Sequence, residues 1–186
     1  LRGTAEPAYA IVPTSVADYD SVKPDWAALP LAQRQQEART LLQQAGFGSG
    51  KPLRLTMQYY TESKTRTLAV AMASMWKAIG VQCDLVNKDL GAVISSVRAG
   101  DYQVSLYAWY SSFDDPFTYL DLLVTKPRGS ATGYSNPAFD DAFRKGNEIA
   151  DPAQRSKALA QAEALAMKDF PVVPLFFAYG QKLVGP

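Results

Sequence analysis

The chain has 186 residues, 47% of them hydrophobic and 20% charged, a composition typical of a globular domain that buries about 70% of its unfolded surface. Nineteen basic and eighteen acidic side chains leave a formal net charge of +1, which excludes binding to nucleic acid by charge alone. Histidine is absent, and this excludes imidazole-dependent catalysis and His-ligated metal sites within the chain.

Two further features bear on the class of protein. Cys83 is the single cysteine, so no internal disulfide can form, and its alternating apolar surroundings favour a buried thiol. No apolar run approaches the roughly 20 residues that a membrane span needs, and the first residues lack the apolar core of a signal peptide. We expect a soluble chain from which any targeting signal has been removed.

Residues 1–30 contain four prolines and no sustained apolar period. This pattern predicts an extended segment that lies along the surface, followed by an α/β lobe over residues 31–186. Pro30 marks the start of a helix of about 15 residues, and Gly46 marks its end.

Residues 53–60 alternate between apolar and polar types, which predicts a strand. Residues 63–80 then place Leu68, Met72, Met75 and Ile79 on one helical face, and residues 81–86 return to a period of two. A strand, helix and strand in this order predict a right-handed βαβ unit with parallel strands.

The alternation of element types continues along the chain. Residues 90–99 form a predicted helix that ends at Gly100, and residues 102–109 form a third strand. Residues 123–136 lack an apolar period and predict a long loop. Helices then begin at Asn136 and Asp151, the second ending near Asp169. Two short strands, 171–178 and 182–184, turn around Gly180. The fold class is α/β, with a central sheet that is mixed but mainly parallel.

Aromatic and hydroxyl side chains follow the third predicted strand. In open parallel sheets ligands bind beyond the carboxyl ends of the strands, and Trp109 ends this strand. Residues 109–113 therefore predict an aromatic platform with flanking hydroxyl groups. The alternative is that these aromatic side chains pack in the core. The candidate ligand-binding residues are Tyr107, Trp109, Tyr110, Ser111, Ser112, Phe113 and Asp114.

Other charged residues have simpler explanations. Asp114 and Asp115 could supply the two carboxylates of a hydrolase, but an acid that precedes Pro116 is best explained as a helix cap. Lys126 and Arg128 could bind an anion, although such loop charges are usually solvated. We predict no catalytic residue, no metal site and no cofactor.

The order of short motifs resembles the extracytoplasmic solute-binding proteins of the oligopeptide and dipeptide ABC importers, bacterial solute-binding protein family 5. Together the motifs cover nearly the whole chain. In chain order they are residues 38–47, 76–81 and 100–102, Trp109 with 114–116, residues 134–140, Asp151 and Pro152 with Arg155, and residues 169–175.

The resemblance implies the C-terminal lobe of a two-lobed, type II periplasmic binding protein that closes on its ligand by hinge motion. It implies three partners: a small polar solute such as a peptide or modified peptide, a membrane permease, and an N-terminal lobe of the same protein. The implied location is periplasmic or extracytoplasmic, with a membrane anchor possible through a missing N-terminus. An interaction module that binds no solute is a further alternative. Nickel, which some relatives carry, finds no histidine ligand here.

One position departs from the family pattern. In peptide binders of this family, an aspartate three residues after the tryptophan pairs with the ammonium group of the ligand, and Ser112 stands there in this chain. Loss of one partner of a buried charge pair typically costs about 2–5 kcal/mol, or roughly 30- to 5,000-fold in affinity. Asp114, two residues further on, could serve as a displaced substitute. The resemblance thus implies a ligand without a free α-amine.

Overall fold

The computed structural model describes residues 5–21, 23–126 and 131–178, which fall into two compact units. The first unit comprises Leu1–Ala27 and Ser111–Pro186, and the second comprises Ala28–Tyr110. We describe each unit separately. None of the helices in the described ranges combines the length and the apolarity that a bilayer span requires.

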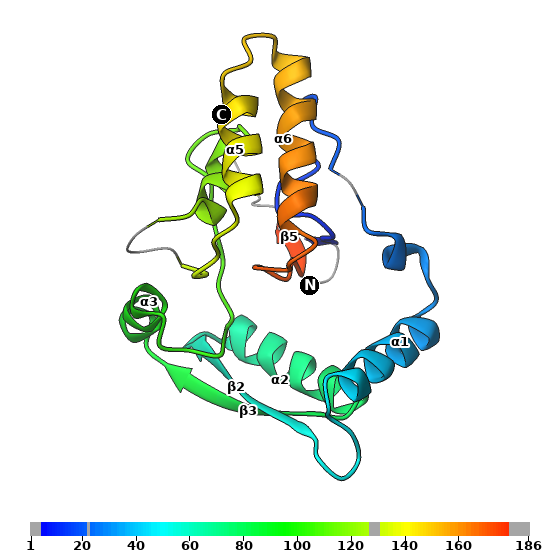
Figure 1. The fold of residues 1–186 in the computed structure, drawn as a ribbon. Coiled ribbons are helices and arrows are strands. Elements are labelled where there is room, and N and C mark those ends of the chain that lie inside the picture. Colours follow the sequence, from blue (N-terminus) through cyan, green and yellow to red (C-terminus); the bar gives the residue numbers. More distant parts are fainter. Residues whose placement is uncertain (1–4, 22, 127–130, 179–186) are drawn as a thin grey trace, which may run out of the picture. The chain divides into compact units, whose positions relative to one another are not determined.

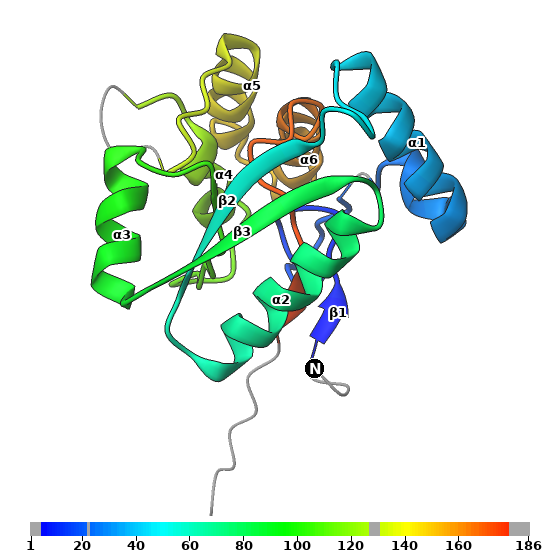
Figure 2. The same ribbon diagram turned by 90° about the horizontal axis from the view of Figure 1, so that it is seen from below.

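A parallel three-stranded sheet forms the centre of the second unit. Strands β2 (Leu53–Tyr60) and β3 (Val81–Lys88) pair in register along their full length, and β4 (Val104–Ser105) pairs with the other edge of β2. Figure 2 shows β2 and β3 side by side with α2 (Ser63–Lys77) nearby. The predicted βαβ unit is confirmed. The third strand is shorter than predicted, because only two residues of β4 pair with β2.

The two faces of this sheet differ in polarity. One face carries the apolar side chains, with Met57, Tyr59 and Val81 buried, and α2 packs against β2 and β3. The buried residues of α2 are Thr65 and Ala69. The prediction that Met75 lies on the core face is wrong, since this side chain is 68% exposed. Small residues thus let the helix approach the strands closely.

Helix boundaries in this unit follow local signals. Helix α3 (Leu90–Ala99) begins where Asp89 accepts a hydrogen bond from the Ala92 amide, and it ends at Gly100 with φ of 70°. Helix α1 (Leu31–Gln44) is followed by Gly46, whose φ of 83° confirms the predicted left-handed stop. Both predicted helices are confirmed at these ends.

Two long helices dominate the first unit and lie side by side (Figure 1). Helix α5 (Pro137–Asn147) begins at Asn136 and α6 (Pro152–Ala166) begins at Asp151, and each cap residue accepts backbone N–H groups, as the sequence predicts. Helix α6 ends at Ala166, three residues before the predicted end. A Cβ atom on Gly146 would lie 2.9 Å from Leu159 Cδ2, so this glycine permits the close helix contact.

The N-terminal segment contributes directly to the core of the first unit. Val12, Val16 and Tyr19 are buried in the same cluster as Phe139 and Leu159. The prediction that residues 1–30 lie along the surface is therefore wrong for this stretch, because apolar residues without a regular period still fill a core. Buried Glu163 accepts hydrogen bonds from the Ile11 and Val12 amides and from the Tyr19 hydroxyl.

Short elements complete this unit. Strands β1 (Ala5–Pro7) and β5 (Phe176–Ala178) form a separate antiparallel pair. Its short helices are α4 (Phe117–Leu120) and η2 (Asp121–Leu123), and η1 (Asp25–Ala28) spans the boundary between the two units. Of the two predicted C-terminal strands, the first is present only as β5, and the second and Gly180 lie outside the described residues. The α/β fold class is confirmed, with a parallel sheet and a separate antiparallel pair.

Candidate ligand-binding site

Aromatic side chains lie exposed beyond β4 in the second unit. Tyr107 is 45% exposed, Trp109 is 49% exposed and Tyr110 is 80% exposed. Because β4 ends at Ser105, Trp109 follows the strand by four residues and does not end it as predicted. The alternative that these aromatic side chains pack in the core is wrong for this structure. They are available to stack on a ligand.

These residues share one edge of the sheet with the last residues of the neighbouring strands. Tyr60 ends β2 and Lys88 ends β3 in matched register. Partial burial raises the pKa of the Tyr60 hydroxyl, and its hydrogen bond with Glu62 and the nearby charge of Tyr110 raise it further. Tyr60 and Lys88 therefore lie at the carboxyl edge of the sheet, where ligands bind in open parallel sheets.

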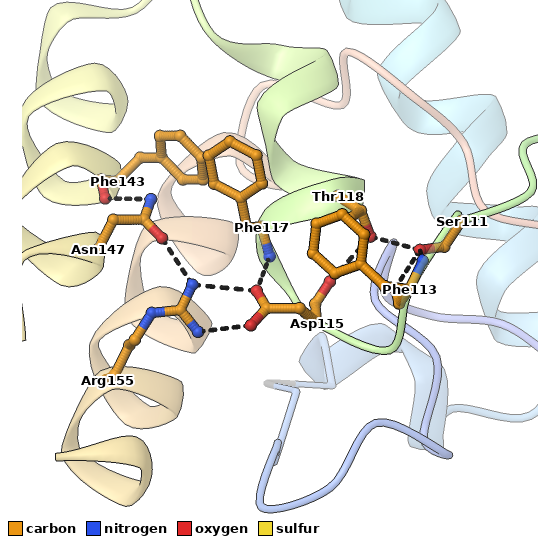
Figure 3. Close-up of polar contacts among 8 residues, drawn as sticks. All are labelled: Ser111, Phe113, Asp115, Phe117, Thr118, Phe143, Asn147 and Arg155. Carbon is orange, nitrogen blue, oxygen red and sulfur yellow. Dashed lines mark hydrogen bonds and ion pairs between the residues drawn. The ribbon is translucent and has the colours of Figure 1, made fainter. Parts of the chain in front are cut away.

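In the first unit, the Ser111 hydroxyl group is engaged in hydrogen bonds close to its own loop. Ser111 Oγ lies 2.6 Å from Thr118 Oγ1, accepts the Phe113 amide at 3.2 Å and donates to the Phe113 carbonyl oxygen (Figure 3). Thr118 Oγ1 in turn donates to the Asp115 carbonyl oxygen at 2.8 Å. The Ser111 hydroxyl thus holds the loop in shape and has little capacity left for a ligand.

Asp115 fixes the far end of this loop to the two long helices. Its carboxylate accepts both Nη atoms of Arg155, at 2.9 and 3.0 Å, and also the Phe117 amide at 2.8 Å (Figure 3). Arg155 Nη2 further donates to Asn147 Oδ1 at 2.8 Å. Partial burial raises the pKa of Asp115, but hydrogen bonds from Arg155 and Phe117 outweigh this effect, so the pKa is lowered.

Between these two anchors, three candidate residues project freely. Ser112, Phe113 and Asp114 are exposed, Phe113 by 58%. Within the part of the chain that the structure describes, the side chains of Ser112 and Asp114 form no hydrogen bond or ion pair. Of the predicted residues on this loop, these three are therefore free to contact a ligand, and Ser111 is not.

The structure argues against the alternative of a hydrolase that uses Asp114 and Asp115, because the Asp115 carboxylate is not free to take part in catalysis. Asp115 is committed to Arg155 and to the Phe117 amide, and its lowered pKa keeps it ionised. Asp115 accepts the Phe117 amide in the first turn of α4, but the N-cap of this helix is Pro116, so the predicted capping residue lies one position before the N-cap. Asp114 alone cannot act as an acid and base pair.

Two further predictions concern the loop cations Lys126 and Arg128 and the absence of a metal site. Lys126 forms an ion pair with Asp121 at 2.8 Å, while Arg128 lies outside the described residues. In residues 5–21, 23–126 and 131–178, no three Cys, Asp or Glu side chains gather in a group that could hold a metal ion.

Sequence reasoning missed the partners that shape the loop. In the sequence, Arg155 belongs to one of the family motifs, and no pattern marks Asn147. A bidentate pair between residues 40 positions apart leaves no local pattern, whereas the contact of Asp115 with the Phe117 amide does.

The fold is that of one lobe of a type II periplasmic binding protein, as its similarity to solved structures of MppA and OppA shows. A sequence profile described as "Bacterial extracellular solute-binding proteins, family 5 Middle" matches residues 1–131. The chain belongs to this family of bacterial extracellular solute-binding proteins, which confirms the family predicted from its motifs.

Individual relatives agree with this assignment. The periplasmic oligopeptide-binding protein OppA of Haemophilus influenzae is 32% identical over 184 residues, which are 97% of this chain and 34% of that protein. The structure of the Escherichia coli murein tripeptide binding protein MppA has a TM-score of 0.90 at 28% identity, covering 96% of this chain and 35% of MppA. The chain spans about a third of the length of these relatives.

A liganded relative is also similar. The structure of Haemophilus influenzae OppA in complex with RPPGFSPFR has a TM-score of 0.89 at 31% identity, covering 95% of this chain and 35% of OppA. A nickel-related structure, NikA from Staphylococcus aureus in complex with Ni(L-His)2, has a TM-score of 0.81 at 17% identity and shares the fold alone.

Proposed function

We propose that this chain is the C-terminal, ligand-binding lobe of the substrate-binding component of a peptide-type ABC importer. The observation that carries the proposal is the row of exposed aromatic side chains, Tyr107, Trp109 and Tyr110, at the carboxyl edge of a parallel sheet. Large exposed aromatic side chains at such an edge are typical of a ligand site. A second lobe of the same protein would close on the solute from the other side.

The mode of action is capture and delivery, without chemistry. The relatives are named as periplasmic oligopeptide-binding and murein peptide-binding proteins, and the carboxylate best suited to catalysis, Asp115, is held by Arg155. The protein would bind its solute outside the cytoplasm, in the periplasm or at the membrane surface, and pass it to a membrane permease.

The ligand is proposed to lack a free α-amine. Ser112 is exposed and neutral at the position where the family pattern places the aspartate that pairs with the ligand's ammonium group. A hydroxyl group cannot form that ion pair, and Asp114 lies two residues further along. Blocked or modified peptides and glycoconjugates therefore fit the site better than ordinary peptides.

The experiment is a titration of the intact protein with matched peptides, one with a free N-terminus and one acetylated, followed by tryptophan fluorescence. Binding of acetylated peptides as tightly as, or more tightly than, their free-amine partners is the expected result. Tight binding of free-amine peptides only would contradict the ligand proposal and move the ammonium partner to Asp114 or to the other lobe.

The same titration distinguishes solute capture from the alternative, an interaction module that binds no solute. A Trp109→Phe variant should lose most of the fluorescence change if Trp109 reports occupancy, because Trp26 and Trp76 remain as unaffected emitters. Absence of saturable binding by any peptide or glycopeptide in the panel would count against solute capture and in favour of the interaction module.

A further inference from the structure

The second face of the parallel sheet is polar and carries an open hollow of about 410 Å³. Because side chains alternate along strands, Thr56 and Gln58 of β2 lie on the same face as Val86 and Lys88 of β3. The hollow is lined by Thr56, Gln58, Val86, Lys88, Val104 and residues 100–103.

Among the described residues that line this hollow, Lys88 is the only cation, and its ammonium group is held in place. Lys88 Nζ donates to Gln58 Oε1 at 2.8 Å and to Ser96 Oγ of α3 at 2.8 Å. A lysine ammonium group has three N–H donors, so one remains. Among the residues that the structure describes, Lys88 has no carboxylate within ion-pair distance.

The partners of Lys88 are themselves fixed. Gln58 is only 4% exposed, and its Nε2 donates to Ser105 Oγ at 3.1 Å. A continuous chain of hydrogen bonds therefore runs from Ser105 through Gln58 and Lys88 to Ser96. Neutral oxygen acceptors position the ammonium group without cancelling its charge. A site arranged in this way is organised before a ligand arrives.

The acidic residues around the hollow do not neutralise the positive charge of Lys88. Asp89 is used as the cap of α3, where it binds the Ala92 amide. Asp101 lines the hollow and Asp84 lies on the same face, but both side chains are exposed, so water screens them strongly. Lys88 is half-buried, and its attraction for an anion is screened less.

We propose that this hollow is an anion subsite in which Lys88 binds a carboxylate group of the captured solute. The free Lys88 N–H supplies the donor to a carboxylate oxygen, and the Ser96 hydroxyl oxygen accepts from Lys88 and holds the ammonium group in place. The subsite rests on the proposed function, and it adds to it: the solute carries an acidic group in addition to lacking a free α-amine. Lys88 here is a contacting residue, and Gln58 and Ser96 position it.

The first test uses acetate alone and does not depend on peptide binding. We would titrate sodium acetate at constant ionic strength into the ¹⁵N-labelled intact protein and follow the Gln58 side-chain amide and the Ser96 backbone amide. Saturable shifts of both signals are expected. The Lys88→Gln variant keeps an amide donor for Gln58 but lacks the charge, and it should lose the saturable response.

The matched control for this titration is Lys77→Gln, which removes an exposed lysine from the end of α2. It should respond to acetate as the unmodified protein does. If Lys88→Gln folds poorly, Lys88→Met provides a second test of the acetate response, because it replaces the lysine with an uncharged, apolar side chain of similar length. Shifts that rise linearly with acetate, or that persist in folded Lys88 variants, overturn the proposal.

The second test links the subsite to the solute. An acetylated tetra-alanine with a free C-terminal carboxylate should bind about tenfold more tightly than its C-terminal amide, the usual weight of one charge-assisted hydrogen bond. Lys88→Gln should remove this preference and Lys77→Gln should keep it. Equal affinities in the unmodified protein overturn the subsite while leaving peptide capture intact. A saturable acetate response without peptide binding supports the subsite and contradicts the proposed function.

Discussion

Asp115 meets Arg155 through both of its carboxylate oxygens, at 2.9 and 3.0 Å. The two residues are 40 positions apart, and the pair ties the end of the loop of residues 111–114 to helix α6. The side chains of Arg155 and Asp115 are only 22% and 29% exposed. A bidentate pair with this degree of burial restrains the loop geometrically as well as electrostatically, so the exposed residues that precede Asp115 start from a fixed anchor.

Removal of this restraint should lower stability more than removal of a surface ion pair. Arg155→Met leaves the Asp115 carboxylate half-buried without its partner, and we expect a loss of about 1–3 kcal/mol in the free energy of unfolding. Urea unfolding followed by fluorescence measures it. The matched control is Arg144→Met on α5, where Arg144 pairs with exposed Asp141 and Glu148, and its effect should be much smaller.

The same pair should matter for ligand affinity. Asp115→Asn keeps an acceptor for the Phe117 amide but weakens the contact with Arg155, so the loop should become more mobile and ligand affinity should fall several-fold. Equal losses of stability from Arg155→Met and Arg144→Met, with unchanged affinity in Asp115→Asn, would show that the pair does not position the loop.

Glu163 predicts an unusual pH dependence of stability. Burial raises the pKa of its carboxyl group above the ordinary value of 4.5, although hydrogen bonds from Val12, Tyr19 and Ile11 oppose the shift. The folded state therefore binds a proton more tightly than the unfolded state. This contribution to stability is fully present below pH 4.5 and is lost as the pH rises through the pKa of the folded state.

A substitution isolates this contribution. Glu163→Gln keeps an acceptor for the Ile11 and Val12 amides and cannot ionise, so its stability relative to the unmodified protein should improve as the pH rises from 4 to about 8. Glu163→Ala should lose about 2–4 kcal/mol, since two buried N–H groups lose their partner. Urea unfolding at several pH values measures both variants. A pH-independent difference between Glu163→Gln and the unmodified protein would contradict the raised pKa.

The sequence predicted those features of the fold that depend on neighbouring residues. The caps at Asn136 and Asp151, the left-handed stop at Gly46 and the helix end at Gly100 follow from backbone chemistry within a few residues. The βαβ unit follows from two changes of apolar period. These signals were sufficient for the fold class and for most helix ends.

Features that depend on distant partners were missed. Glu163 reaches Val12 across 151 positions, and this contact carries the N-terminal segment into the core. Met75 satisfies the helical period but faces solvent, because Thr65 and Ala69 lie against the strands. In the candidate site, exposure of the aromatic side chains could not be read from the sequence, since the same residues suit a core equally well.

The close approach of α5 and α6 gives a packing prediction. A methyl group on Gly146 would lie 2.9 Å from Cδ2 of the fully buried Leu159. Gly146→Ala gains about 1 kcal/mol in helix propensity but overpacks the contact, which typically costs about 1–3 kcal/mol. Together the two effects predict a net loss of about 0–2 kcal/mol in the free energy of unfolding, which urea unfolding measures.

A double-mutant cycle tests the assignment of this loss to Leu159. Leu159→Ala alone should cost about 2–5 kcal/mol through the cavity it leaves. In the double variant, the methyl group introduced by Gly146→Ala has room, so the combined loss should be clearly less than the sum of the two single losses. Strict additivity would place the strain of Gly146→Ala elsewhere.

Ser112 offers the sharpest test of ligand class, because a single substitution should restore the family's ammonium partner. Ser112→Asp places a carboxylate on an exposed position of a loop that Ser111 and Asp115 hold in shape. Affinity for free-amine peptides, relative to their acetylated partners, should rise by about 30-fold or more. Ser112→Asn is the matched control, being similar in shape but uncharged, and it should leave the preference unchanged. If the unmodified protein already prefers free-amine peptides and Asp114→Asn removes that preference, Asp114 is the ammonium partner and the ligand is an ordinary peptide.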